Sequence, residues 1–485
     1  MTAKAVMVLG TTSGAGKSWL TTALCRYYAR CGLKVAPYKA QNMSNNARVV
    51  AGGEIGSAQY FQALAARAMP EVRMNPLLLK PEKDTQSQVV LLGQVNAELS
   101  KMAWRDRSAV VWPVVAQALD ELLAENDVVV IEGAGSPAEI NLKASDIVNM
   151  RVALHARAAC LLVTDIDRGG AFAHLYGTWA MLEPAEQHVI KGFVLNKFRG
   201  DATLLSPGPQ MLQDLTGVPT VATLPMWWQH GLPEEDGVFD DRTRSSGAVT
   251  QTIAVIAYPR ISNLDEFQPL KNVPGLRLVW ARSPAELAGL TASDCVILPG
   301  SKATTSDLAW LRAQGLDQAI ADHAGRGGVV LGICGGLQML GEALIDPHGI
   351  DGNGPGLGLL PVVTVFEENK TVQHRHTRFT VLTGVWAALS GVEVSGYEIH
   401  HGQTAPHSAM AVAGDAPMLV MPDGLAWQNR AGNVLGVYLH GLFEDPAVLA
   451  ALFGAAVPTL DAVFDALADY VEQHFNAGFL QSLVR

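Results

Sequence analysis

Cysteine is scarce in this chain of 485 residues, and its few cysteines lack a pattern that would give them a shared role. A disulfide framework needs pairs of cysteines, and a zinc site needs closely spaced thiols. The cysteines are odd in number and none form CxxC spacing: Cys25, Cys31, Cys160, Cys295 and Cys334. We therefore expect reduced thiols in a cytoplasmic protein.

An excess of basic charge and long apolar runs are also lacking. The 35 lysines and arginines stand against 46 aspartates and glutamates, a formal net charge of −11, which argues against nucleic acid or an anionic membrane surface as partner. No apolar stretch approaches the roughly 18 to 20 residues of a membrane span. The stretch AVMVLG at 5–10 is too short for a secretion signal. The sequence leaves the oligomeric state open.

What is abundant is an alternation of apolar runs with helical periodicity. Strands that alternate with helices predict a doubly wound α/β domain with a parallel sheet. In the first 225 residues, runs typical of buried strands are Ala5–Leu9, Val35–Tyr38, Val128–Glu132, Cys160–Thr164 and Gly192–Asn196.

A polar, acidic and turn-rich stretch, GLPEEDGVFDDRTRSSGAVT, separates this pattern from a second one. The second pattern has strand runs at Ile253–Tyr258, Leu276–Trp280, Cys295–Leu298 and Gly328–Ile333, and turns more strand-like from about Leu357. We expect a second doubly wound α/β domain here. The predicted divisions are a first domain at 1–230, a linker at 231–250, a second domain at 251–449 and a helical tail at 450–485.

The sequence GTTSGAGKS at 10–18 joins the first predicted strand to the first predicted helix. In such a loop, backbone N–H groups and the helix N-terminus bind phosphate, lysine adds a charge, and a serine hydroxyl can bind Mg²⁺. The usual motif has four residues between its first glycine and the Gly-Lys pair; here there are five. We predict an ATP-binding loop, with an ordinary glycine-rich turn as the alternative. Its residues are Thr12, Gly14, Ala15, Gly16, Lys17 and Ser18.

Two carboxylates are candidates for the same site. Glu132 ends a predicted strand, and the carboxyl ends of parallel strands are where such sheets bind ligands. Glu54, in GGEIGSAQ, is expected to begin a helix. Mg²⁺ takes hard oxygen ligands, so both carboxylates are candidates, although Glu54 could equally cap its helix.

These residues carry a family resemblance. The loop and EGAG at 132–135 resemble the dethiobiotin synthetase type of P-loop domain, which activates carboxylates with ATP. The segment PYKAQNMSNNARVVAGGEIGSAQ at 37–59 resembles the cobyric acid synthase (CobB/CobQ) family, as do VTDIDRGGAF at 163–172 and LNKFRGD at 195–201. ParA/MinD-type ATPase switches resemble this branch too, but they carry an extra lysine early in the loop that this chain lacks.

The resemblance implies roles for individual residues of the first domain. Lys17 and Lys39 would face the phosphates of ATP, and Asn196 would contact the nucleotide, with an ordinary loop as the alternative at Asn196. Ser18, Glu54 and Glu132 would be the candidate ligands of Mg²⁺.

In the second domain, VVLGICGGLQMLG at 329–341 places Cys334 at a sharp turn between a strand and a helix. A nucleophile on such an elbow is exposed above the sheet, and the helix N-terminus favours its thiolate. The N–H of Gly335 would then belong to an oxyanion hole. A buried structural cysteine is the alternative.

Two further segments support a cysteine nucleophile. VILPGSKAT at 296–304 offers backbone amides at Gly300 and Ser301, and VLGVYLHGLF at 434–443 places His440 after an apolar strand, as a general base. With GxCxGxQ, which includes Gln338, these segments resemble a class I glutamine amidotransferase. The resemblance implies that Gly300, Ser301, Gly335 and Gln338 bind glutamine or its oxyanion.

One residue departs from the wider amidotransferase class. Most members have a glutamate two residues after the histidine, where this chain has Leu442, as the cobyric acid and cobyrinic acid diamide synthases do. Glu444 and backbone carbonyls remain as candidates to orient the imidazole. In SGYEIHHGQT at 395–404, Tyr397, Glu398 and His400 could line the glutamine site or a domain interface, or be an ordinary strand. His374 and His376 are interpreted as a solvated strand face.

Together the two domains predict ATP- and glutamine-dependent amidation of a carboxylate. The resemblance implies the b, d, e and g carboxylates of adenosylcobyrinic acid a,c-diamide as the acceptors, with ATP, Mg²⁺ and glutamine. Three rivals stay open: cobyrinic acid a,c-diamide synthase, CTP synthase, and an ATPase switch with a vestigial amidotransferase domain.

Overall fold

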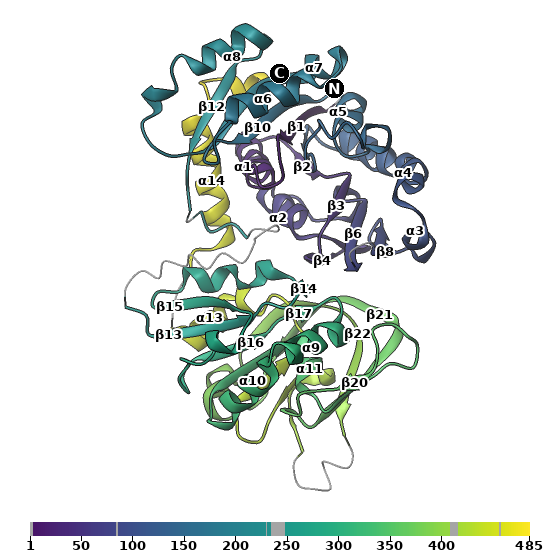
Figure 1. Cartoon of the computed structure of the whole chain (residues 1–485), viewed down its shortest axis with the longest axis vertical. Helices are drawn as coiled ribbons and strands as arrows, with labels where there is room; N and C mark the ends of the chain where they lie inside the picture. Colours follow the sequence, from purple (N-terminus) through teal and green to yellow (C-terminus); the bar gives the residue numbers. More distant parts are fainter. Residues whose placement is uncertain (1–2, 84–85, 229, 234–247, 408–415, 455–456) are drawn as a thin grey trace.

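The computed structural model describes residues 3–83, 86–228, 230–233, 248–407, 416–454 and 457–485. Two large β-sheets, one in each half of the chain, form its framework (Figure 1). Most of the predicted linker, residues 234–247, lies outside the described residues. Among the helices of the described ranges, none is long and apolar enough to cross a membrane.

The first sheet is fully parallel, as the alternating pattern predicts. Its strands are buried because helices cover both faces. In spatial order they are β12 (Thr220–Pro225), β11 (Ile190–Phe198), β10 (Ala159–Asp165), β1 (Lys4–Gly10), β9 (Val128–Glu132) and β2 (Val35–Tyr38).

The helices of the first half divide between the two faces of this sheet. Successive side chains of β1 point to opposite faces, so Met7 packs in one core and Val8 in the other. The helices are α1 (Lys17–Arg30), α2 (Ser57–Ala65), α3 (Ala97–Lys101), α4 (Trp104–Glu125), α5 (Met150–His155), α6 (Ala171–Ala180), α7 (Pro184–Val189) and α8 (Gly208–Thr216). Short 3₁₀ turns are η1 (Val72–Met74), η2 (Lys143–Ser145) and η3 (Ala202–Leu205).

A small β-structure between β2 and α4 was not predicted from the sequence. It consists of the sheet β3 (Gln41–Met43), β6 (Leu77–Lys83), β7 (Gln86–Leu91) and β8 (Gln94–Val95), and of the hairpin β4 (Ala47–Val50) and β5 (Gly53–Gly56). The expectation that Glu54 begins a helix is therefore wrong. Glu54 pairs with Val49 in the hairpin, and α2 begins only at Ser57.

The second large sheet is parallel over five strands and antiparallel at one edge. In order its strands are β15 (Leu276–Ala281), β13 (Gln251–Ile256), β16 (Cys295–Leu298), β18 (Val329–Ile333), β25 (Val434–Val437), β24 (Ala426–Gln428) and β23 (Met418–Met421). Its helices are α9 (Thr304–Ala313), α10 (Leu316–Gly325), α11 (Gly335–Leu340) and α13 (Pro446–Phe453).

A long antiparallel hairpin accounts for the strand-like pattern after Leu357. It belongs to the sheet β20 (Gly354–Pro355), β19 (Ala343–Ile345), β21 (Val362–Arg378) and β22 (Glu393–Pro406). Other short elements described in this half are β14 (Ile261–Ser262), β17 (Gly300–Ser301), η4 (Leu264–Asn272), η5 (Pro284–Glu286), η6 (Gly384–Leu389), η7 (Pro422–Gly424) and η8 (Leu442–Glu444).

The C-terminal segment is helical, as predicted, but it returns to the first half. Figure 1 shows the yellow helix α14 (Leu460–His474) beside the purple and teal elements of that half. It packs on α1, where Arg26 forms ion pairs with Asp461 and Asp465. The last helix, α15 (Phe479–Ser482), lies in the same core, whereas α13 packs on the second half.

Candidate active sites

The predicted ATP-binding loop at 10–18 lies at the carboxyl end of β1 and leads into α1. Gly14 and Gly16 have positive φ angles of 70° and 98°. A Cβ on Gly16 would lie 2.1 Å from the Nδ2 atom of Asn196, so both the conformation and the close contact require glycine. Lys17 Nζ donates to the carbonyls of Thr12, at 3.0 Å, and Gly135, at 3.2 Å.

Glu132 collects three donors at the carboxyl end of β9. Its Oε1 atom accepts from Ser18 Oγ and from Lys39 Nζ, both at 2.8 Å, and its Oε2 atom accepts from Gln62 at 2.6 Å. Burial raises the pKa of this carboxyl, but Lys39 and the hydrogen bonds outweigh burial, so the pKa lies below its usual value. The structure thus brings Ser18, Lys39 and Glu132 together and keeps the carboxylate charged.

The same place suits a hydrated Mg²⁺ ion. Ser18 and Glu132 present adjacent hard oxygens, and Mg²⁺ in nucleotide sites takes few protein ligands and keeps several waters. Among the described residues, no group of three or more His, Cys, Asp or Glu side chains could hold a metal ion.

Glu54 lies in a different environment from the other two candidate Mg²⁺ ligands. Its carboxylate accepts from Lys80 at 2.5 Å and from Lys370 at 2.7 Å, and the glutamate is 1% exposed. Burial raises the pKa of Glu54, yet Lys370 and Lys80 outweigh it and hold the pKa at about 2. Since Lys370 belongs to the long hairpin of the second half, Glu54 joins the two halves.

Asn196 lies within β11, is buried, and contacts the loop itself. Its amide donates to the carbonyl of Ala15 at 2.9 Å, and the neighbouring Lys197 donates to the carbonyl of Gly14 at 2.8 Å. These two residues hold the backbone of the predicted ATP-binding loop in place.

Cys334 stands at the sharp turn that the sequence predicts, between β18 and α11. Its φ of 51° and ψ of −104° are unusual for a residue with a side chain. Such strain is typical of a nucleophile held on an elbow. The residue is 5% exposed, and its backbone N–H donates to the carbonyl of Val437.

The Nδ1 atom of His440 lies 3.3 Å from both oxygens of Glu266. Cys334 lies close enough to raise the pKa of this imidazole, and its own Sγ atom donates to the carbonyl of Ile399 at 3.8 Å. Burial lowers the pKa of the imidazole, but the negative charges of Glu266 and Cys334 outweigh it and raise the pKa to about 10. The three side chains form a buried Cys–His–Glu arrangement. In it, the carboxylate orients the imidazole and favours its protonated form.

Glu266 is the partner of His440 that the sequence did not reveal. The Glu444 alternative for orienting His440 is wrong, because Glu444 pairs with Arg48 of the first half. The stretch around Glu266, NLDEFQPL, has none of the glycine-rich features that mark the loop at 10–18 and the turn at Cys334. Its carboxylate is fully buried and also accepts the backbone N–H of Gly441, and only the fold reveals both facts.

The predicted oxyanion residues lie beside this arrangement. A Cβ on Gly335 would lie 2.8 Å from the backbone nitrogen of Ser301, and a Cβ on Gly300 would lie 2.7 Å from Cε1 of His440. The Ser301 hydroxyl donates to Asp307 at 2.6 Å, which fixes the loop. Gln338 is buried, and its Oε1 atom accepts from Thr304 at 3.1 Å.

The SGYEIHHGQT strand contributes to the site and to the interface. Tyr397 stacks on His440, with ring centroids 5.4 Å apart, and its hydroxyl accepts from Asn263 at 2.8 Å. His400 stacks on Tyr438 and contacts Glu398 at 2.9 Å. His374 is not simply solvated as expected, because its Nε2 atom lies 2.7 Å from the carbonyl of Val49 in the first half.

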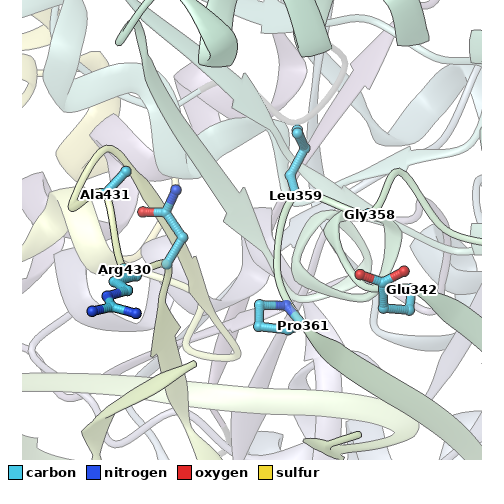
Figure 2. Close-up of a pocket in the computed structure, with 7 residues that line it drawn as sticks. Glu342, Gly358, Leu359, Pro361, Arg430 and Ala431 are labelled. Atoms are coloured by element: carbon cyan, nitrogen blue, oxygen red, sulfur yellow. The ribbon is translucent and has the colours of Figure 1, made fainter. Parts of the chain in front are cut away.

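A separate pocket of about 420 Å³ lies at the end of β24 and the start of β21. Figure 2 shows Arg430 and Ala431 on one side of it and Glu342 on the other. Its lining contains none of the predicted site residues: Glu342, Gly358, Leu359, Pro361, Asn429, Arg430 and Ala431.

Comparison with known families matches both halves. Residues 6–231 match the CobQ/CobB/MinD/ParA nucleotide binding domain, and residues 252–448 match the CobB/CobQ-like glutamine amidotransferase domain. Fold and site thus define a nucleotide-binding domain joined to a glutamine amidotransferase domain.

Relatives that match this chain over its full length define its family more narrowly. The cobyric acid synthase of Polaromonas naphthalenivorans (strain CJ2) is 84% identical, and that of Variovorax paradoxus (strain S110) is 76% identical, each over 100% of both chains. The chain belongs to the cobyric acid synthase family, which confirms the resemblance seen at 37–59. A solved glutamine amidotransferase aligns with 42% of this chain and 99% of its own at 18% identity, with a TM-score of only 0.31.

Proposed function

We propose that this protein is a cobyric acid synthase. It amidates the b, d, e and g carboxylates of adenosylcobyrinic acid a,c-diamide with ATP and with ammonia taken from glutamine. The proposal rests on the presence of two sites in one chain. One is the predicted ATP-binding loop with the Ser18–Glu132 contact, and the other is the buried Cys334–His440–Glu266 arrangement. The full-length identity to cobyric acid synthases supports this activity over the three rivals, which are cobyrinic acid a,c-diamide synthase, CTP synthase and an ATPase switch.

In the first half, ATP phosphorylates a substrate carboxylate. A carboxylate is a poor electrophile, and an acyl phosphate is a good one, which is why ATP is consumed. The loop amides and the charges of Lys17 and Lys39 bind the phosphates. Ser18 and Glu132 would hold Mg²⁺, which would supply positive charge for the transferred phosphoryl group. Asn196 supports the loop through Ala15. Glu54 serves the interface rather than the metal, because both of its lysine partners neutralise it.

In the second half, the thiolate of Cys334 attacks the side-chain carbonyl of glutamine. The backbone N–H groups of Ser301 and Gly335 stabilise the oxyanion, and Gln338 helps to shape the glutamine site. His440, protonated beside Glu266, gives its proton to the departing ammonia and leaves a glutamyl thioester. It then takes a proton from the water that hydrolyses the thioester to glutamate. Ammonia displaces phosphate from the acyl phosphate in the first half.

The cellular setting follows from the thiols and the substrates. All five cysteines are free, and Cys334 has to stay reduced to act. We therefore place the enzyme in the cytoplasm, where ATP and glutamine are available.

The Cys334→Ser variant tests the mechanism. With glutamine as the nitrogen source, corrinoid amidation is expected to fall by about 100-fold or more, because the nucleophile is lost. High ammonium restores it, because the ATP-dependent half is intact. Full glutamine-dependent turnover by this variant, in the absence of free ammonia, would overturn the mechanism.

The substrate is tested by mass. Incubation with cobyrinic acid a,c-diamide, ATP and glutamine is expected to add four amides, and cobyrinic acid itself to remain unchanged. Amidation of cobyrinic acid alone would instead assign the diamide synthase activity.

A further inference from the structure

A short segment of the first half reaches into the second half beside its catalytic histidine. The carbonyl oxygen of the Asn46 side chain accepts the backbone N–H of Leu264 at 2.9 Å, and Asn263 contacts the backbone of Ala47 at 3.4 Å. In Figure 1, β4 lies on the side of the first half that faces the second half. These bonds fix the start of η4, two residues before Glu266.

Arg48 stands at the centre of this contact, and its side chain is 2% exposed. Its guanidinium donates to Asp265, the residue next to Glu266, and to Oε2 of Glu444 at 2.8 Å. Asp265 and Glu444 belong to the second half, so a charge from the ATP-binding half neutralises two carboxylates of the amidotransferase half.

The same guanidinium also covers a ring that touches the histidine. The Cζ atom of Arg48 lies 5.1 Å from the ring centroid of Tyr397. The ring of His440 stacks on the ring of Tyr397, with the two centroids 5.4 Å apart. Arg48 therefore contacts both supports of the imidazole: the loop that carries Glu266 and the ring of Tyr397.

The charges explain why an arginine is needed here. Asp265, Glu266 and Glu444 are three carboxylates close to one another. Burial raises the pKa of Glu444, and the charges of Asp265 and Glu266 raise it further, against the lowering effect of Arg48. His440 balances Glu266, and Arg48 balances the other two. The remaining titratable groups facing Arg48 are Tyr60, whose ring is 5.6 Å away, and Tyr397. Without Arg48, the buried Asp265 and the partly buried Glu444 would lie near Glu266 as negative charges without the guanidinium that pairs with them.

We propose that Arg48, although part of the ATP-binding half, is a positioning residue for glutamine hydrolysis, holding Glu266 and Tyr397 in place around His440. The glutaminase site is therefore complete only when the two halves are docked, which ties ammonia release to the presence of the half that uses it. The inference rests on the proposed function, in which Cys334 and His440 hydrolyse glutamine.

The test compares Arg48→Met with Arg26→Met in the full-length protein. Arg26 is a matched control, since it is also a fully buried arginine of the first half that pairs with two carboxylates, Asp461 and Asp465. For each variant, glutamate release, ammonium-dependent corrinoid amidation and the pH profile of glutamate release are measured.

We expect Arg48→Met to lower kcat for glutamate release by about tenfold or more, with little change in KM for glutamine. The acid limb of its pH profile is expected to move up by about one unit, because neighbouring carboxylates lose a positive charge. Ammonium-dependent amidation stays close to wild type, Arg48→Lys recovers part of the loss, and Arg26→Met leaves the profile unchanged.

A second variant keeps the inference open to failure if Arg48→Met is poorly folded. The double change Arg48→Met with Glu444→Gln removes one of the two unpaired carboxylates and is expected to recover part of the glutaminase rate. Equal loss of both activities in Arg48→Met, an unshifted pH profile, or no recovery in the double variant would overturn the inference. A wild-type protein that releases no glutamate would instead overturn the proposed function on which it rests.

Discussion

The Nδ1 atom of His440 lies 3.3 Å from each oxygen of Glu266, a residue that stands 174 positions earlier in the chain. The class-typical glutamate two residues after the histidine is replaced by Leu442, whose side chain is buried in the core. A carboxylate from η4 thus occupies the orienting position from a different part of the fold. The relationship places a buried carboxylate beside the histidine that we propose as the general base.

The Glu266→Gln variant is expected to lose glutaminase activity by at least about tenfold, because the imidazole loses its orienting charge. The pKa of His440 should fall from about 10 toward its ordinary value, since Glu266 is the main group that raises it. The protonated imidazole is then lost at lower pH, so the alkaline limb of the pH profile moves to lower pH.

The pH dependence of glutamate release checks this prediction, with exposed Glu367→Gln as the matched control. An alkaline limb at the wild-type pH in Glu266→Gln would show that another group sets the pKa of His440.

The Glu132→Gln variant is expected to lose ATP-dependent amidation by about 100-fold or more, with glutamine and with ammonium alike. The change removes a candidate Mg²⁺ oxygen and leaves Lys39 buried without its carboxylate. Glutamate release and corrinoid amidation are measured on the same samples. Wild-type amidation with ammonium would remove Glu132 from the phosphoryl-transfer site.

The Glu54→Gln variant separates an interface role from a metal role. The buried Lys80 and the partly buried Lys370 would lose their shared carboxylate, so the apparent free energy of unfolding should fall by about 3–5 kcal/mol. The concentration of Mg²⁺ that gives half-maximal activity should not change. A raised Mg²⁺ requirement with unchanged stability would make Glu54 a metal ligand.

The same carboxyl predicts an acid-sensitive contribution to stability. Burial raises the pKa of Glu54, but Lys370 and Lys80 outweigh it and bring the pKa to about 2. A depressed pKa stabilises the folded state above the unfolded value of about 4.3, and this contribution is lost as the pH falls toward 2. Urea unfolding at a series of pH values should show this loss in the wild type and not in Glu54→Gln.

Leu467→Ala tests the return of α14 to the first half. Leu467 is fully buried in the core shared with α1, so its truncation should lower the free energy of unfolding by about 2–5 kcal/mol. Leu215→Ala, at a residue that is 66% exposed, is the matched control and should change it by less than about 0.5 kcal/mol. Equal effects in urea unfolding would mean that the α14 contact contributes little.

The sequence by itself determined the elements that depend on neighbouring residues. The predicted strands at Val35–Tyr38, Val128–Glu132 and Cys295–Leu298 have the same bounds in the structure. The loop at 10–18 and the elbow at Cys334 are equally local, because a few adjacent glycines and one strand end define them. Apolar periodicity and turn chemistry act over a few residues, so a single sequence displays them.

Only the tertiary structure decided which distant side chains meet. Glu266 contacts His440, Arg48 pairs with Glu444, and Glu54 pairs with Lys370, although nothing in the sequence spacing of these residues predicts the contacts. The same is true of α14, which packs on α1 rather than on the half that precedes it. A buried charge is stable only beside an opposite one, and the packing of whole elements, which local periodicity does not encode, selects that partner.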